Sequence, residues 1–181
     1  MKKTFRHKIG RYLFLKEFGK HGTKQQYVTF KDAKSIGILY DSTNEKHYEI
    51  VKKYVKDIRE KFQKEVIALG FYDQKELPPM RFSKLGLDFF TRKDLNWYQK
   101  PNAPIVKNFV QREFDILIDL HMVNSIPFRF IVASSKANFK IGKYERLSTP
   151  FYDFMLSVSD ETKFPQFLEQ VNHYLNSMRN D

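Results

Sequence analysis

The chain has 181 residues, a length typical of one domain, and its 32 Lys and Arg outnumber its 21 Asp and Glu to give a net charge of +11. Hydrophobic residues make up 41% of the chain, which is enough for a packed core and argues against wholesale disorder. The chain has no Cys, which excludes disulfides, thiolate metal sites and a cysteine nucleophile. No run of ~20 apolar residues and no signal-peptide pattern occurs, so we expect a cytoplasmic protein.

The basic charge is concentrated near the N-terminus. Residues 1–24 contain eight Lys or Arg and one Glu, a net charge of +7. Such a segment attracts polyanions, either nucleic-acid phosphates or anionic lipid headgroups. We interpret residues 1–24 as a basic, aromatic-rich N-terminal arm, in which the phosphate-binding side chains are those of Lys2, Lys3, Arg6, Lys8 and Arg11.

The same segment has a second interpretation, as a helix that packs on the domain and leaves its lysines in solvent. On a helical wheel one side carries the apolar residues Phe5, Ile9, Tyr12, Leu13 and Leu15. Lys16 interrupts that side, and Phe14 and Phe18 point elsewhere, so the amphipathic pattern is moderate. Glycines in the segment 19–22 are typical of a hinge after such a helix.

Beyond this segment, strand and helix patterns alternate. Short apolar runs predict strands at residues 34–40, 65–71, 87–90, 114–120, 139–144 and 152–158. Apolar residues at helical spacing predict helices at 45–63, 104–112 and 125–137, and a last helix capped by residues 159–161. This βαββαβαββα order predicts an α/β fold for residues 25–181, a three-layer Rossmann-like or flavodoxin-like domain with a mostly parallel sheet of about five or six strands.

A sheet of this kind binds ligands beyond the carboxyl ends of its strands, where the strand order reverses. If the strands, numbered along the chain, lie side by side in the order 3-2-1-4-5-6, that point is between the strands that end near Tyr40 and Leu120. The predicted crevice there contains Asp41, Ser42, Asp119 and His121. The two carboxylates could hold a metal ion, or act in acid–base chemistry with His121 as a base. The alternative is that Asp41 forms a helix cap or an Asx-turn and Asp119 forms a structural hydrogen bond.

Motifs of common enzymes are lacking. No G-x-G-x-x-G, no P-loop, no G-x-S-x-G elbow and no H-E-x-x-H spacing occurs in the chain. We therefore assign no catalytic residues and expect no cofactor and no metal ion. Whether the protein is an enzyme stays open, and the sequence favours a binding protein.

One loop interleaves cations with aromatic side chains. It begins at Arg92 and Lys93 and includes Trp97 and Tyr98. Aromatic faces stack on bases while cations hold phosphates, which makes this segment a candidate stacking loop. The alternative is that Trp97 covers the end of the hydrophobic core.

Two resemblances extend this interpretation. The segment 114–144, with Asp119-Leu120, Ala137 and Ile141-Gly142, resembles part of the N-terminal, acceptor-side domain of heptosyltransferase-type glycosyltransferases, which implies an α/β fold. The whole domain also resembles a family of small, functionally uncharacterised bacterial proteins. The shared elements are Lys93-Asp94 with Trp97, Phe114-Asp115, and Ser135-Lys136-Ala137 with Phe139 and Gly142.

We therefore expect a non-enzymatic cytoplasmic binding protein that associates with RNA or a ribonucleoprotein such as the ribosome through its basic arm. One alternative is a glycosyltransferase-like or nucleotide-handling enzyme with its site at the sheet crevice. Another is a peripheral protein of an anionic membrane surface. A protein partner is also compatible with the sequence, and the oligomeric state is not predicted.

Overall fold

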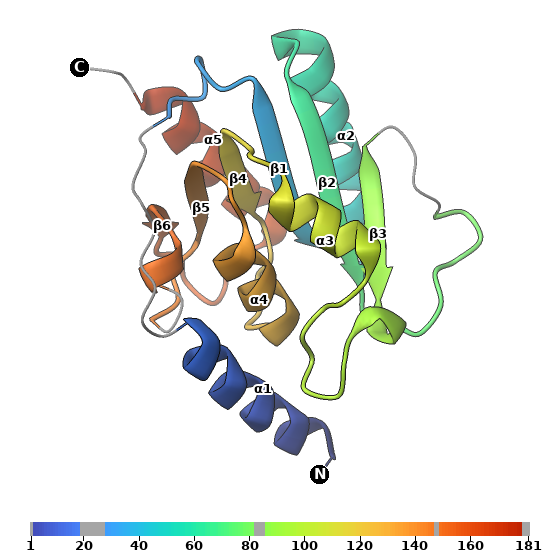
Figure 1. The fold of residues 1–181 in the computed structure, drawn as a ribbon. Helices are drawn as coiled ribbons and strands as arrows, with labels where there is room; N and C mark the ends of the chain where they lie inside the picture. Colours follow the sequence, from blue (N-terminus) through green and yellow to red (C-terminus); the bar gives the residue numbers. More distant parts are fainter. Residues whose placement is uncertain (1, 19–27, 82–85, 147–148, 179–181) are drawn as a thin grey trace.

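Six parallel strands form the centre of the structure, a computed structural model that describes residues 2–18, 28–81, 86–146 and 149–178 (Figure 1). The strands are β1 (Ser35–Asp41), β2 (Glu65–Tyr72), β3 (Leu87–Thr91), β4 (Ile116–Asp119), β5 (Phe139–Lys143) and β6 (Phe154–Leu156). The helices are α1 (Lys2–Phe18), α2 (Glu45–Phe62), α3 (Pro104–Gln111), α4 (Ile126–Ser134) and α5 (Phe164–Ser177). Two short 3-10 turns are η1 (Arg92–Asp94) and η2 (Thr149–Phe151).

The strand order across the sheet is β3-β2-β1-β4-β5-β6, which confirms the predicted α/β class and agrees with the order assumed in locating the switch point. Parallel strands need crossover connections, and right-handed crossovers on alternate faces produce an order that reverses between two neighbouring strands. Those neighbours are β1 and β4, where Leu39 lies opposite Asp119. The predicted switch point is therefore present.

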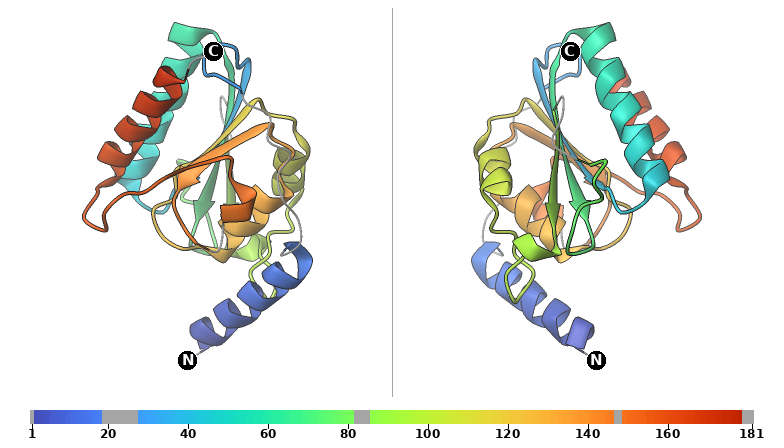
Figure 2. Two further views of the ribbon diagram at one scale, coloured as in Figure 1. Left: turned by 90° about the vertical axis from the view of Figure 1, so that its left-hand side faces the viewer. Right: turned by 90° about the vertical axis from the view of Figure 1, so that its right-hand side faces the viewer.

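Helices cover both faces of the sheet, as the side views show (Figure 2). Helices α2 and α5 pack on one face, and α3 and α4 pack on the other. Strand β1 alternates between these two cores: Ile36, Ile38 and Tyr40 belong to the first and Leu39 to the second. Ile116, Leu117 and Ile118 of β4 are also buried, as is Leu120 directly after the strand, as expected for a central parallel strand.

Most predicted elements lie within two or three residues of the observed ones. The last helix is an exception at its start, because it begins at Phe164 rather than directly after residues 159–161. The backbone N–H of Lys163 donates to the Gln166 side chain over 2.8 Å, and Pro165 occupies the first turn. These two features place the helix start later than the Ser-Asp-Glu signal indicated.

The basic segment at the N-terminus forms helix α1, which packs against α4 instead of extending away from the domain (Figure 1). Phe14 is fully buried, and its ring lies 5.3 Å from that of Phe130 and 5.2 Å from that of Phe151. The inward side of α1 is thus not the predicted one, since Phe5 and Tyr12 are each 66% exposed. The predicted hinge and the boundary at residue 24 lie outside the described residues.

Gly10 marks the closest approach of α1 to the rest of the domain. A Cβ atom at this position would lie 2.4 Å from the carbonyl oxygen of Tyr98 and 3.1 Å from a methyl group of Ile126. A backbone carbonyl cannot move aside as a flexible side chain can, so only glycine allows this contact. No helix among the described residues has the length and apolar character that crossing a membrane requires.

The contact at Gly10 predicts that Gly10→Ala loosens α1 even though alanine favours helix formation by ~1 kcal/mol. Overpacking of this kind costs ~1–3 kcal/mol, so we expect trypsin to cleave within α1 about 10-fold faster. The matched control is Leu15→Ala on the outward side of the same helix, which should change the cleavage rate little. Equal cleavage rates for wild type and Gly10→Ala would contradict this packing.

Candidate functional site

Helix α1 and the loop after β3 meet, although about 90 residues separate them in sequence. The guanidinium of Arg6 donates to the carbonyl oxygen of Trp97 over 2.7 Å and to that of Asn96 over 3.1 Å. Lys100 of the same loop lies 2.5 Å from a carboxylate oxygen of Glu17. The structure therefore joins the two segments that the sequence had suggested separately for phosphate binding and for base stacking.

Within the predicted stacking loop, two cations are held by the domain itself. Arg92 pairs with Asp73 over 2.5 Å, and Lys93 pairs with Glu76 over 2.8 Å. These ion pairs attach the loop to the segment after β2.

The two aromatic residues of the loop point in different directions. Tyr98 is partly buried and its ring lies 6.1 Å from that of Phe130 in an edge-on arrangement. Trp97 is 61% exposed. Tyr98, and not Trp97, therefore covers this end of the core, and Trp97 presents its ring to solvent.

The cations of α1 also differ in whether they bond to the rest of the domain. Arg6 is engaged with the loop carbonyls, whereas Lys8, Arg11 and Lys16 are exposed and form no ion pair among the described residues. The side chains of Lys2 and Lys3 lie outside the described part of the chain. We call the exposed side of α1 together with Trp97 the α1 surface; its members are Phe5, Lys8, Arg11, Tyr12, Lys16 and Trp97.

His7 lies on the inward side of α1. Burial, together with the nearby charges of Arg129 and Arg11, lowers the pKa of His7 below its ordinary value, while Glu145 opposes the shift. A protonated His7 is therefore disfavoured in the docked helix. This makes the packing of α1 sensitive to pH.

At the switch point, Asp119 and His121 are brought together at the carboxyl end of β4. The Nδ1 atom of His121 lies 2.5 Å from Oδ1 of Asp119, and the Tyr152 hydroxyl donates to Oδ2 over 2.5 Å. Asp119 is only 1% exposed. Burial and the Asp119 carboxylate raise the pKa of Tyr152 well above its ordinary value, so this phenol stays protonated and keeps donating.

The other two predicted crevice residues do not join this group. Asp41 accepts a hydrogen bond from the backbone N–H of Thr43 over 2.8 Å, which is the local turn considered as its alternative role. Ser42 is fully buried, and its side chain lies beside Tyr40 and Gly70 on the α2 side of the sheet. Strand alternation explains the position of Ser42, because Asp119 lies opposite Leu39 and successive residues of a strand point to opposite faces.

Sequence reasoning missed two buried arginines near this edge of the sheet. Arg129 pairs with Glu145, and one of its terminal nitrogens has no hydrogen-bond partner among the described residues. Arg81 donates to the Ser42 carbonyl and to Glu45, and lies over the ring of Tyr48 at 4.3 Å. For Arg129 a signal existed, since it is the only charged residue in the apolar run 126–133.

An Asp–His pair can orient an imidazole as a general base, because the carboxylate fixes which ring nitrogen carries the proton. Here the His121 ring lies flat against Phe128 with 4.8 Å between ring centres, and its side chain is 11% exposed. Ser42, the candidate hydroxyl of the crevice, is on the other face of the sheet. The geometry is therefore that of a structural hydrogen-bond network that joins the end of β4 to the segment before β6, with the His121 ring packed on Phe128 of α4.

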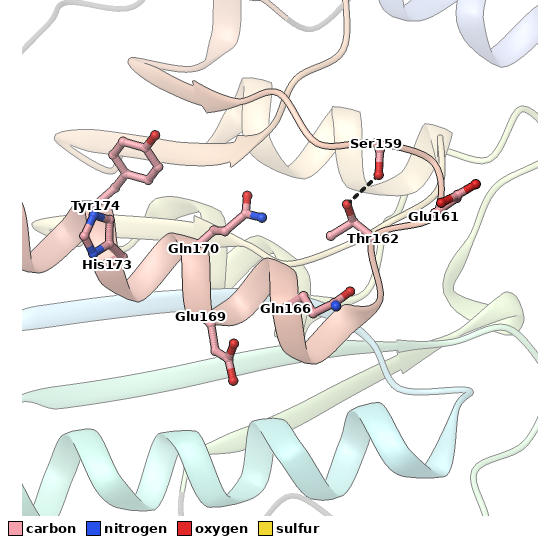
Figure 3. A pocket seen from close by; sticks show the side chains of 8 residues that line it. All are labelled: Ser159, Glu161, Thr162, Gln166, Glu169, Gln170, His173 and Tyr174. Carbon is pink, nitrogen blue, oxygen red and sulfur yellow. Dashed lines mark hydrogen bonds between the residues drawn. The ribbon is translucent and has the colours of Figure 1, made fainter.

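A separate, shallow pocket of about 720 Å³ lies along the outward side of α5 and the loop before it (Figure 3). Its lining is polar and acidic, with Glu161 and Glu169 and without Lys or Arg, and Ser159 bonds to Thr162 over 3.1 Å. Among the described residues, no group of three or more His, Asp or Glu is arranged to hold a metal ion. The acidic lining distinguishes this pocket from the cationic α1 surface.

The half-buried position of His7 predicts a pH dependence of α1 packing. The undocked His7 titrates near 6.5 and the docked one lower, so protons bind the undocked state preferentially as the pH falls below about 6.5. Docking is therefore unaffected at higher pH and weakens on acidification. Amide hydrogen exchange of α1 between neutral and acidic pH, corrected for intrinsic rates, measures this effect.

The variant His7→Gln should remove most of that pH dependence. His47 provides the matched control, because burial also lowers its pKa but its ring stacks on Phe164 between α2 and α5. His47→Gln should leave the response of α1 to acid intact. If both variants respond to pH as wild type does, His7 does not control the docking.

The Asp119 network predicts a loss of stability when a donor is removed. Tyr152→Phe leaves the buried carboxylate with one donor fewer, and we expect a loss of ~1–3 kcal/mol in the free energy of unfolding, measured with urea. Tyr144→Phe is the control, since Tyr144 is 52% exposed and its change should stay within ~0.5 kcal/mol. Equal stability of the two variants would show that the network adds nothing.

Comparison with known proteins supports the resemblance noted from the sequence. A search among curated proteins and a search among solved structures found no match, so the local likeness to glycosyltransferases gains no support from them. A family described as a family of unknown function (DUF6913) matches residues 6–178, which include most of α1, the loop with Trp97 and all six strands. The chain belongs to this family, DUF6913.

Proposed function

We propose that this protein binds RNA through the cations of the α1 surface. The observation that carries the proposal is the exposed set of Lys8, Arg11 and Lys16 on a helix whose other side is fixed to the domain. Cations held on a rigid support neutralise phosphates with little loss of conformational entropy. The net charge of +11 adds a favourable long-range field for a polyanion.

RNA fits this surface better than a membrane does. A helix that lies in a membrane interface separates an apolar side from a cationic side. On α1 the apolar side that could enter lipid packs against α4, where Phe14 is buried beside Phe130. The exposed side mixes Phe5 and Tyr12 with Lys8 and Lys16, and mixed aromatic and cationic surfaces are typical of nucleic-acid binding.

The enzyme alternative has less support among the described residues. It needed Asp41, Ser42, Asp119 and His121 in one crevice, and two of the four are engaged elsewhere. Asp119 already accepts hydrogen bonds from His121 and Tyr152. We therefore retain RNA binding, alone or within a ribonucleoprotein such as the ribosome, as the proposed function.

The test is the salt dependence of binding to a fluorescein-labelled RNA, followed by anisotropy. The change is the triple variant Lys8→Glu, Arg11→Glu, Lys16→Glu. Each lost phosphate contact lowers the slope of log affinity against log salt by ~0.7, so the slope should fall by about 2. Affinity at low salt should fall by at least about 10-fold for the same reason.

The matched control reverses three exposed lysines of α2, Lys46, Lys53 and Lys56, and so changes the net charge by the same amount. Helix α2 lies on the far face of the sheet from α4 (Figure 2). The control should keep most of the affinity. Equal losses in the two variants would indicate a nonspecific charge effect, and binding to vesicles of phosphatidylglycerol without binding to RNA would favour a membrane role.

A further inference from the structure

Trp97 lies on the outside of the molecule, and the residue is 61% exposed. The neighbouring residue Tyr98, and not Trp97, packs against the core. The two rings meet edge-on, with 5.3 Å between their centres. The indole therefore has no packing role that matches its size. A cationic surface that also carries an exposed aromatic side chain is typical of proteins that bind single-stranded nucleic acids.

The loop that carries Trp97 is held by its own hydrogen bonds. The Asn96 side chain accepts from the backbone N–H groups of Tyr98 over 3.1 Å and Lys100 over 2.9 Å. The backbone N–H of Asn96 donates to the Lys100 carbonyl over 3.0 Å, and Leu95 forms a bridge with Pro101. Asp94 closes the base of the loop by accepting from the Thr91 hydroxyl over 2.9 Å.

The same loop is fixed relative to α1. Arg6 donates to the carbonyl oxygen of Trp97 itself, and Gly10 packs against that of Tyr98. Trp97 therefore keeps a set position beside the first half of the cationic helix. A ligand that binds both elements does not have to order either of them, and such preorganisation increases affinity.

We propose that Trp97 is a stacking platform for an unpaired base, so that the RNA bound by the α1 surface is single-stranded. This inference rests on the proposed function and specifies its substrate class. Phosphates of the strand contact the exposed cations of α1, and one base unstacks from the adjacent bases and stacks on the indole ring of Trp97. A duplex keeps its bases stacked inside the helix and offers no free face for Trp97.

Trp97 is the only tryptophan of the chain, so its fluorescence reports on this site alone. The probes are a single-stranded RNA oligonucleotide and the duplex formed with its complement, each titrated into the full chain. We expect quenching of the tryptophan emission by the single strand and little quenching by the duplex. The affinity for a labelled single strand should exceed that for the duplex.

The variants separate stacking from charge. Trp97→Leu should weaken single-strand binding by roughly 10-fold or more, the effect typical of one lost stacked base, and Trp97→Phe should recover part of it. Duplex binding should be the same in both variants. Tyr174→Leu on α5 is the matched control, because it replaces another exposed aromatic residue, 41% accessible, on a different side of the protein.

The outcomes distinguish this inference from the proposed function. If wild type binds both RNA forms equally and Trp97→Leu binds as wild type does, the stacking inference fails and the binding of RNA phosphates stands. If wild type binds neither form, both fail. A blue shift of the emission with anionic vesicles and no response to RNA would also overturn both, in favour of insertion of Trp97 into lipid.

Discussion

The requirement that a parallel sheet be covered on both faces governs the rest of this structure. Strand β1 lies at the centre of the sheet and contributes apolar side chains to both cores. Asp115 joins it to the start of β4 by accepting from the backbone N–H groups of Lys34 over 2.8 Å and Ser35 over 2.9 Å. With β1 and β4 paired, the carboxyl ends of both strands meet at one edge, where ligands of such sheets normally bind.

In this protein the same edge is occupied by the chain itself. Helix α1 lies below the carboxyl ends of the strands in Figure 1 and packs on α4, and Phe14 is its fully buried contact. Asp119, His121 and Tyr152 form a closed hydrogen-bond network beneath. At the switch point these side chains bond to one another, and the outward side of α1 is a separate surface that carries exposed cations.

Several residues that carry the resemblance to DUF6913 have structural roles at these positions. Asp94 shapes the loop of Trp97, and Gly142 leaves room for the Tyr152 ring, which an added Cβ would meet at 2.5 Å. Asp115 holds β1 against β4. Trp97 is different, because the residue is 61% exposed and its ring meets that of the neighbouring Tyr98 edge-on.

The sequence alone determined the order of strands and helices, since each apolar run is long enough and regular enough to report its own local structure. The strand order was not determined by the sequence, because crossover handedness narrows the possible orders without selecting one, and only the structure shows β3-β2-β1-β4-β5-β6. The tertiary structure alone decided which side of α1 is buried: Phe14 fits between Phe130 and Phe151, residues more than 100 positions away that no helical wheel includes. It likewise decided that Tyr98 turns inward and Trp97 outward, because that choice depends on the space left by α1 and α4 and not on the two residue types.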